Sequence, residues 1–146
     1  MAMDVFDSLK ISGSALKAER VRLNTISSNI ANIETTRTPE GGPYQKREVV
    51  FRSTNKIFAD RLEEKMRGAA VQGVEVSEIH KSTEPPKMVY DPSHPDANTE
   101  GMVAMPGINL FEEMADMMTA TRAYVANVAA VKAAKHMAMK ALEIGR

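Results

Sequence analysis

Apolar residues near the end of the chain recur with a helical period. From Leu110 onward they return alternately after four and three residues, and no proline or internal glycine breaks the run before Gly145. This spacing is typical of a helix that packs along a neighbouring helix, as in a coiled coil, and Asn109 is placed to cap its start. Only Thr121 and Lys135 interrupt the stripe. It predicts a subunit interface made by Leu110, Met114, Met117, Thr121, Tyr124, Val128, Val131 and Leu142.

The beginning of the chain has the same pattern. Asp4 can cap a helix there, and Thr38 and Pro39 form a break that it does not cross. Residues 27–36 are rich in Ser, Asn and Thr, which favour caps and turns, so we expect the helix to give way to a shaped loop. Basic residues between the apolar positions should face solvent, namely Lys10, Lys17, Arg20 and Arg22. The stripe predicts a second subunit interface at Val5, Leu9, Leu16, Leu23, Ile26, Ile30 and Ile33.

Between the two helices the pattern shortens and changes period. β-branched and aromatic residues predict strands over residues 44–51 and around residues 74–79, and a shorter one at 88–90. Residues 56–67 fit a short helix. Five of the seven prolines lie within residues 85–106, which indicates an extended loop. The middle of the chain is therefore expected to be a small insert containing β-structure.

These patterns predict a mainly α fold. Long N- and C-terminal helices pair as a coiled-coil-like α-hairpin, with a small β-containing insert between them. Residues 1–36 and 107–146 are expected to form one discontinuous helical assembly domain, and residues 37–106 the β-rich and loop insert. Two amphipathic helices joined in this way leave apolar surface that a single pair cannot hide, and such surface usually marks an interface. Repeated head-to-tail contacts that do not close then give a helical filament.

Composition narrows the possible functions. Nineteen basic and nineteen acidic residues balance in the 146-residue chain, so no net field attracts nucleic acid or an anionic membrane surface. The absence of cysteine excludes disulfides and thiolate chemistry. The first ten residues contain Asp4 and Asp7 and lack an apolar run, so we expect no cleaved secretory signal. No stretch is apolar enough to predict membrane insertion.

Candidate catalytic residues are few. Asp91, His94 and Asp96 lie within six residues of one another, and carboxylates with an imidazole can bind a divalent ion. Their positions among prolines fit better with a rigid loop whose side chains cap its own turns, so we expect no metal, no cofactor and no catalytic residue. Glu112 and Glu113 lie in the first turn of a helix, where the dipole favours negative charge. A hydrolase or metal-dependent enzyme centred on Asp91, His94 and Asp96, and a cytoplasmic helical adaptor or export chaperone, remain as alternatives.

Four sequence runs resemble a known family. Residues 28–32 (SNIAN) followed by Thr35 resemble the N-terminal signature of bacterial flagellar axial proteins. The bacterial flagellar basal-body rod family, and within it the proximal rod members, has similar runs at three further places. These are residues 38–44 (TPEGGPY), 91–98 (DPSHPDAN) and 122–127 (RAYVAN). The residues that carry the family motifs are Asn29, Asn32, Thr35, Asp91, Pro92, His94, Pro95, Asp96 and Gly101.

The resemblance implies a non-enzymatic subunit of the flagellar basal body. It implies a rod in the periplasm that transmits motor torque, with the terminal helices forming an inner tube around an export channel. It also implies passage through the flagellar type III export apparatus without a cleaved signal peptide. The partners implied are copies of the chain itself, other proximal rod proteins and the distal rod protein, with the base (MS) ring and the export gate as further candidates.

Overall fold

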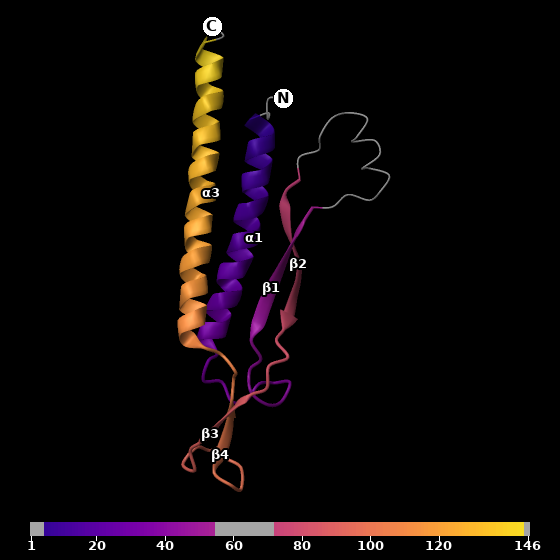
Figure 1. The fold of residues 1–146 in the computed structure, drawn as a ribbon, viewed down its shortest axis with the longest axis vertical. Coiled ribbons are helices and arrows are strands. Elements are labelled where there is room, and N and C mark those ends of the chain that lie inside the picture. Colours follow the sequence, from indigo (N-terminus) through magenta and orange to yellow (C-terminus); the bar gives the residue numbers. More distant parts are fainter. Residues whose placement is uncertain (1–4, 55–71, 145–146) are drawn as a thin grey trace, which may run out of the picture.

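The computed structural model describes residues 5–54 and 72–144. It shows two long helices with a small β insert between them in sequence (Figure 1). The helix expected at residues 56–67 and the cap expected at Asp4 lie outside the described residues. Along the chain the elements are α1 (Val5–Ala31), β1 (Arg47–Ser53), β2 (Val74–Lys81), β3 (Lys87–Tyr90), β4 (Met102–Met105) and α3 (Leu110–Ile144).

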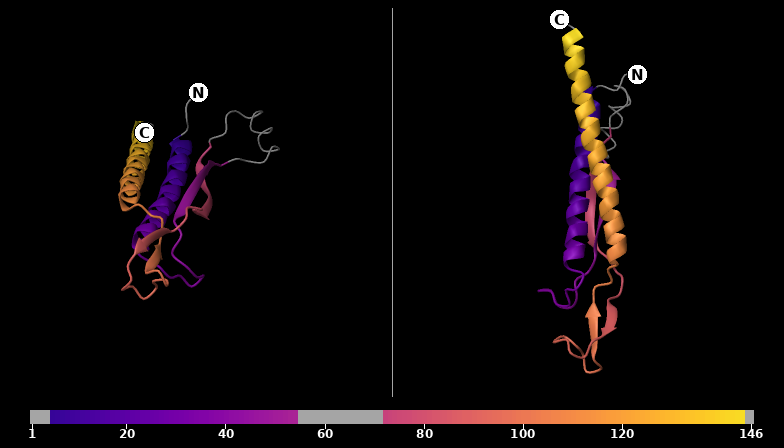
Figure 2. Two further views of the ribbon diagram at one scale, coloured as in Figure 1. Left: turned by 60° about the horizontal axis from the view of Figure 1, so that its bottom comes forward. Right: turned by 90° about the vertical axis from the view of Figure 1, so that its left-hand side faces the viewer.

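Helices α1 and α3 run antiparallel, side by side (Figures 1 and 2). The predicted cap of α3 is confirmed, because the Asn109 Oδ1 atom accepts a hydrogen bond of 3.1 Å from the Phe111 N–H. Helix α1 ends at Ala31, and the chain then enters a turn, as the polar composition of residues 27–36 predicts. Neither helix is long and apolar enough to cross a membrane, within the stretches that the structure describes.

The face that α3 turns toward the rest of the chain also has four-three spacing, but in a different register from the predicted stripe. Met117, Tyr124, Val131 and Ala138 belong to both. Ala120 and Ala134 are buried, whereas their neighbours Thr121 and Lys135, which the stripe had to include as interruptions, are exposed. The inward positions are Glu113, Met117, Ala120, Tyr124, Asn127, Val131, Ala134 and Ala138.

The difference has a physical reason. Ala120 has an exposed fraction of 0%, so α3 approaches its neighbours most closely at its smallest side chains, not at its largest apolar ones. The stripe predicted from the large apolar side chains is therefore displaced by one residue, at several positions, from the face that is buried. Half of the predicted stripe remains uncovered in the single chain, and its assignment to contacts between subunits stays a prediction. The exposed members are Leu110, Met114, Thr121 and Leu142, while Val128 is half-buried.

Helix α1 lies between α3 and the β1–β2 ribbon (Figure 1). Its predicted apolar stripe, from Leu9 to Ile33, is buried or half-buried throughout; the side chain of Val5 lies outside the described part. Arg22 departs from the prediction that it is solvated, because it is half-buried and its Nη2 atom lies 3.5 Å from Asp116 Oδ1. One line of α1 stays exposed along its whole length: Phe6, Lys10, Gly13, Lys17, Arg20, Asn24, Ser27 and Ala31.

The β insert forms two separate antiparallel pairs. Strands β1 and β2 make a ribbon with a bulge between Val50 and Phe51. The ribbon is fastened to α1 where the Val74 N–H donates to Ser14 Oγ at 3.0 Å. The first strand was predicted to begin at Tyr44; it begins at Arg47, since Tyr44 is buried beside the end of α1.

A second hairpin, β3–β4, lies at the end of the molecule opposite to both chain ends (Figures 1 and 2). Strand β3 confirms the short strand predicted at residues 88–90. Strand β4 was not predicted, because its four residues lie between Gly101 and Pro106 in a stretch that reads as a loop. Val103 in β4 is almost completely buried.

Few apolar side chains in the described structure are fully buried, and half of these are alanines. The rest of the packing consists of half-buried residues along the line where α1 meets its neighbours. An elongated arrangement of this kind has a contact seam in place of a globular core. The buried apolar residues are Ala18, Ile26, Tyr44, Val103, Ala120 and Ala134.

The closeness of the helix contact can be tested by overpacking. Ala120→Leu places a larger side chain where the exposed fraction is 0%, so it should lower the free energy of unfolding by about 1–3 kcal/mol. Ala126→Leu on the exposed side of the same helix should change it by less than about 0.5 kcal/mol. Urea unfolding of both variants makes the comparison; equal effects would show that the register described here is wrong.

Candidate functional site

Asn29, in the last turn of α1, is the centre of a buried polar cluster. Its exposed fraction is 1%. Its Nδ2 donates to the Arg47 carbonyl at 2.9 Å and to Glu113 Oε2 at 3.0 Å. Its Oδ1 accepts from the Arg47 N–H at 2.9 Å and from the Tyr44 hydroxyl at 3.1 Å. All four hydrogen-bonding positions of the amide are therefore used. We call Asn29, Tyr44, Lys46 and Glu113 the polar hub.

Glu113 brings the first turn of α3 into the hub. Its exposed fraction is 1%, and its two carboxylate oxygens have separate partners. Oε2 accepts from Asn29, while Oε1 lies 3.1 Å from Lys46 Nζ. The position of Glu113 in the first helical turn predicted a favourable interaction with the helix dipole. The structure adds an ion pair between this buried carboxylate and the half-buried Lys46, and the burial of Glu113 is tolerated because both of its oxygens have partners.

The pKa of Lys46 depends on its contact with Glu113. Its partial burial alone would lower the pKa of the ammonium group, but the hydrogen bond and negative charge of Glu113 outweigh burial. The net result is that the pKa of Lys46 is raised above its ordinary value. The lysine is thus held in its charged form by the first turn of α3.

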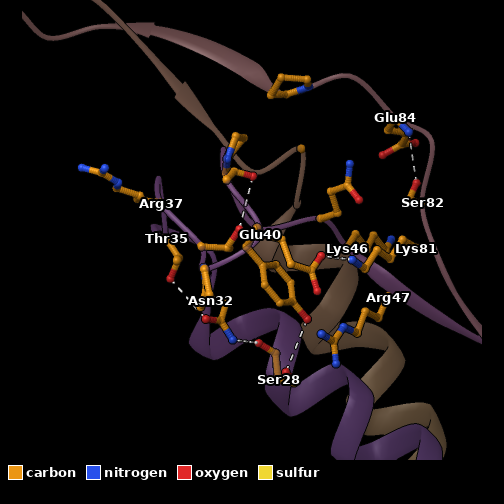
Figure 3. Close-up of a pocket in the computed structure, with 18 residues that line it drawn as sticks. Ser28, Asn32, Thr35, Arg37, Glu40, Lys46, Arg47, Lys81, Ser82 and Glu84 are labelled. Carbon is orange, nitrogen blue, oxygen red and sulfur yellow. Dashed lines mark hydrogen bonds and ion pairs between the residues drawn. The ribbon is translucent and has the colours of Figure 1, made fainter. Parts of the chain in front are cut away.

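The residues after Asn29 shape the end of α1 (Figure 3). Asn32 Nδ2 donates to the Ser28 carbonyl at 2.8 Å, and the Thr35 hydroxyl donates to Asn32 Oδ1 at 3.2 Å. The Tyr44 N–H then donates to the Thr35 carbonyl at 3.0 Å, which closes the loop back onto the helix. This end of α1 borders an open cavity of about 730 Å³ whose lining carries both basic and acidic side chains, including Arg37, Glu40 and Lys81.

The loop between β3 and β4 is held by its own polar side chains, as the sequence predicts. Asp91 Oδ1 accepts from the Ser93 N–H at 3.1 Å and from the Ser93 hydroxyl at 2.6 Å, and these bonds lower the pKa of Asp91. His94 Nδ1 accepts from the Asp96 N–H at 3.1 Å. The Thr36 hydroxyl donates to Asp96 Oδ2 at 2.8 Å, which ties the loop to the segment after α1.

Asp91, His94 and Asp96 therefore do not converge on a common point. Each serves a turn of the loop or its attachment. Among the residues that the structure describes, no group of three or more histidine, aspartate or glutamate side chains is arranged to hold a metal ion. Gly101 completes the loop with a φ of +75°, and a Cβ there would lie 2.9 Å from the ring of Tyr90. The arrangement is that of a rigid bracket.

A second candidate site is the outer surface of α3. Large apolar side chains lie exposed along most of the helix, and exposed alanines fill the intervals between them. Val125, near the middle, has an exposed fraction of 60%. Exposed apolar side chains in this number on one helix indicate a surface that another chain covers. Its members are Leu110, Phe111, Met114, Met118, Val125, Met137, Met139 and Leu142.

The structure distributes the predicted site residues over two places. Asn29, Asn32 and Thr35 gather at the end of α1, whereas the motif that ends in Gly101 forms the tip of the hairpin. Sequence reasoning missed Lys46 and the hydrogen-bonding role of Tyr44. No apolar or polar period marks either residue, because the loop that places them is irregular.

Comparison with known proteins decides what this arrangement belongs to. A family model described as "Flagella basal body rod protein" matches residues 9–37, and a model of the C-terminal region of the flagellar basal body rod FlgEFG proteins matches residues 99–144. A FlgC flagellar basal-body rod protein of Bacillus subtilis is 45% identical over 99% of this chain and 100% of its own. The chain belongs to the flagellar basal-body rod family.

Other relatives carry the same description. FlgC of Borreliella burgdorferi is 40% identical over 97% of this chain and 98% of its own, and FlgC of Salmonella typhimurium is 36% identical over 99% and 98%. This rod protein is therefore a structural subunit and not an enzyme, which confirms the expectation from the resemblance. The two matched segments each include one half of the buried contact between Asn29 and Glu113.

The contribution of the polar hub to the stability of the chain can be measured by removing its central amide. Asn29→Leu removes the buried hydrogen bonds that Asn29 makes to Glu113, Tyr44 and the backbone of Arg47, so the free energy of unfolding should fall by about 2–4 kcal/mol. Asn24→Leu, on the exposed line of the same helix, is the matched control and should cost less than about 0.5 kcal/mol. Thermal or urea unfolding of the two variants tests this; a stable Asn29→Leu protein would show that the hub is dispensable.

The pKa of Lys46 gives a separate test at alkaline pH. Because its pKa is raised in the folded state above the ordinary 10.5, its contribution to stability is complete below that pH and is lost as pH rises through the folded-state pKa. Lys46→Met should be less stable than wild type at neutral pH, and the gap should narrow above about pH 10.5. Urea midpoints measured from neutral to alkaline pH check this. The exposed Lys87→Met should show no such narrowing.

Proposed function

We propose that this chain is a subunit of the proximal part of the rod, in the periplasm, and that it assembles with its terminal helices facing an export channel. The observation that carries the proposal is the exposed apolar surface of α3. A free chain that exposes Phe111, Met118 and Val125 together is incomplete without neighbours. Membership of a rod family gives those neighbours their chemical class, namely other helical axial subunits.

We further propose that residues 1–36 and 107–146 act as one discontinuous helical domain, paired as a coiled coil, with residues 37–106 packed outside the tube. Two features support this division. Asn29 and Glu113, which are 84 residues apart in sequence, share one buried hydrogen bond. The small side chains Ala120 and Ala134 allow the helices to lie close together over many turns. Repeated between neighbouring subunits of the rod, many small contacts of this kind would resist twisting, as transmission of motor torque requires.

The partners follow from the same surface. Copies of the chain, the other proximal rod proteins and the distal rod protein all fit the requirement for a long helical neighbour, and the base ring and export gate fit at the ends of the stack. We propose that the chain reaches this place through the flagellar type III export apparatus. Balanced charge supports a protein partner over nucleic acid.

A substitution at Val125 can test assembly without changing the stability of the single chain. Because this side chain is 60% exposed, Val125→Asp should change the free energy of unfolding by less than about 0.5 kcal/mol. In the assembled rod the same charge would be buried without a partner, at a cost of several kcal/mol. A strain carrying Val125→Asp should therefore express a folded protein and yet be non-motile in a soft-agar assay.

Two variants complete the comparison. Val125→Thr keeps the side-chain shape without a full charge and should swim at close to the wild-type rate. Val128→Asp places the charge at a half-buried position and should lower both stability and motility. If Val125→Asp cells swim normally, the exposed face of α3 is not an interface and the proposed assembly is wrong.

A further inference from the structure

The β3–β4 hairpin has an apolar face that nothing in the described chain covers. Met88 and Tyr90 point to the same side of β3, and their pairing partners Ala104 and Met102 lie beside them on β4. The opposite side carries the buried Val103. Met88 and Tyr90 are exposed by 50% and 69%, which is unusual for large side chains on a short, otherwise well-packed hairpin.

This face is held in a fixed shape. A Cβ atom on Gly101 would lie 2.9 Å from Tyr90 Cε2 and 3.2 Å from Pro92 Cβ, so the ring rests directly against the glycine of the following turn. The loop below it is fastened by the bonds of Asp91 and Asp96 described above. A preset aromatic side chain loses little conformational freedom on binding, which favours its use in an interface.

The stretch that contains the hairpin is acidic. Residues 84–101 contain four carboxylates and one lysine. Asp91 and Asp96 use carboxylate oxygens in bonds to Ser93 and Thr36. Glu84 and Glu100 are exposed, and their carboxylates have no hydrogen bond or ion pair among the described residues. An apolar face in an acidic stretch of the chain favours a partner surface that is both apolar and basic.

The opposite end of the same molecule has that character. Helix α3 extends past the described start of α1 (Figure 1), and its residues 139–143 are all exposed. Leu142 has an exposed fraction of 74%, and Met137 and Met139 lie near it. Residues 130–144 contain three lysines, all exposed, against one glutamate. The chain thus carries a basic, apolar helix end at one extremity and an acidic, apolar hairpin at the other.

We propose that the β3–β4 hairpin of one copy docks on the C-terminal end of α3 of a second copy. The two surfaces lie at opposite ends of an elongated molecule, so one chain cannot join them to each other. A head-to-tail contact of this type leaves a free hairpin and a free helix end after every addition, so it builds an open stack. The inference rests on the proposed role in assembly and specifies which surfaces meet along the stack.

Crosslinking tests the contact directly, because the natural chain has no cysteine. Thr99→Cys at the hairpin tip and Ala141→Cys on α3 are both at exposed positions and leave Tyr90 and Leu142 in place. The two full-length variants, each with a different tag, are mixed and mildly oxidised. The mixed disulfide should form at least several times faster than either disulfide between identical variants. Equal rates for all three products would overturn the proposal.

Charge reversal gives an independent measurement. Glu84→Lys with Glu100→Lys makes both ends basic, and Lys132→Glu with Lys135→Glu makes both ends acidic. Each double variant should self-associate roughly tenfold more weakly than wild type in sedimentation velocity at low salt. The chain that carries all four changes should recover the wild-type affinity. Glu78→Lys, at an exposed position of β2 away from both ends, is the control and should leave association unchanged.

The outcomes separate this inference from the proposed function. A wild-type chain that stays monomeric at about 1 mM, or a fourfold variant that does not recover, overturns docking between copies. Neither result touches the motility test of Val125, because a rod subunit can assemble through different neighbouring chains. Loss of motility in Val125→Asp together with equal crosslinking rates would keep the rod role and remove the head-to-tail contact.

Discussion

The buried contact between Asn29 and Glu113 fixes the relation between the two ends of this chain. Without it α1 and α3 would be held by shallow contacts between small side chains, which specify closeness but not register. A fully satisfied amide and a paired carboxylate admit only one alignment, because a shift of one residue would leave several buried polar atoms unbonded. The contact also places the irregular loop through Tyr44 and Lys46, so the start of β1 depends on it as well.

Local sequence patterns were sufficient for the long elements. The absence of breakers from Leu110 onward and the cap at Asn109 predict α3 almost to the residue, and the polar run after Ser27 predicts the end of α1. Strand β4 was not predicted, because four residues between a glycine and a proline carry too little periodicity to distinguish a strand from a loop. The family motifs predicted the site residues better than the hydrophobic pattern did, because they single out Asn29 and the loop around His94 on grounds other than hydrophobicity.

The register of the helix contact could not be read from apolar periodicity. Two of its inward positions, Glu113 and Asn127, are polar, and three others are alanines that any helix surface can carry. Their inward placement is decided by tertiary contacts that lie far away in sequence. The large apolar residues on the outside of α3 biased the expected stripe toward the surface. In a protein that assembles, the strongest hydrophobic pattern can belong to the contact that the isolated chain does not make.

The thinness of the buried seam has a mechanical consequence. Unfolding exposes little new apolar surface when so few side chains are fully buried, so the change in heat capacity per residue should be small. Pulling on one end of such a hairpin breaks its contacts one after another, with no single core that must fracture at once. A chain with this build can be drawn out into an extended thread under modest force. It becomes stiff only where neighbours enclose it, so its rigidity belongs to the assembly and not to the subunit.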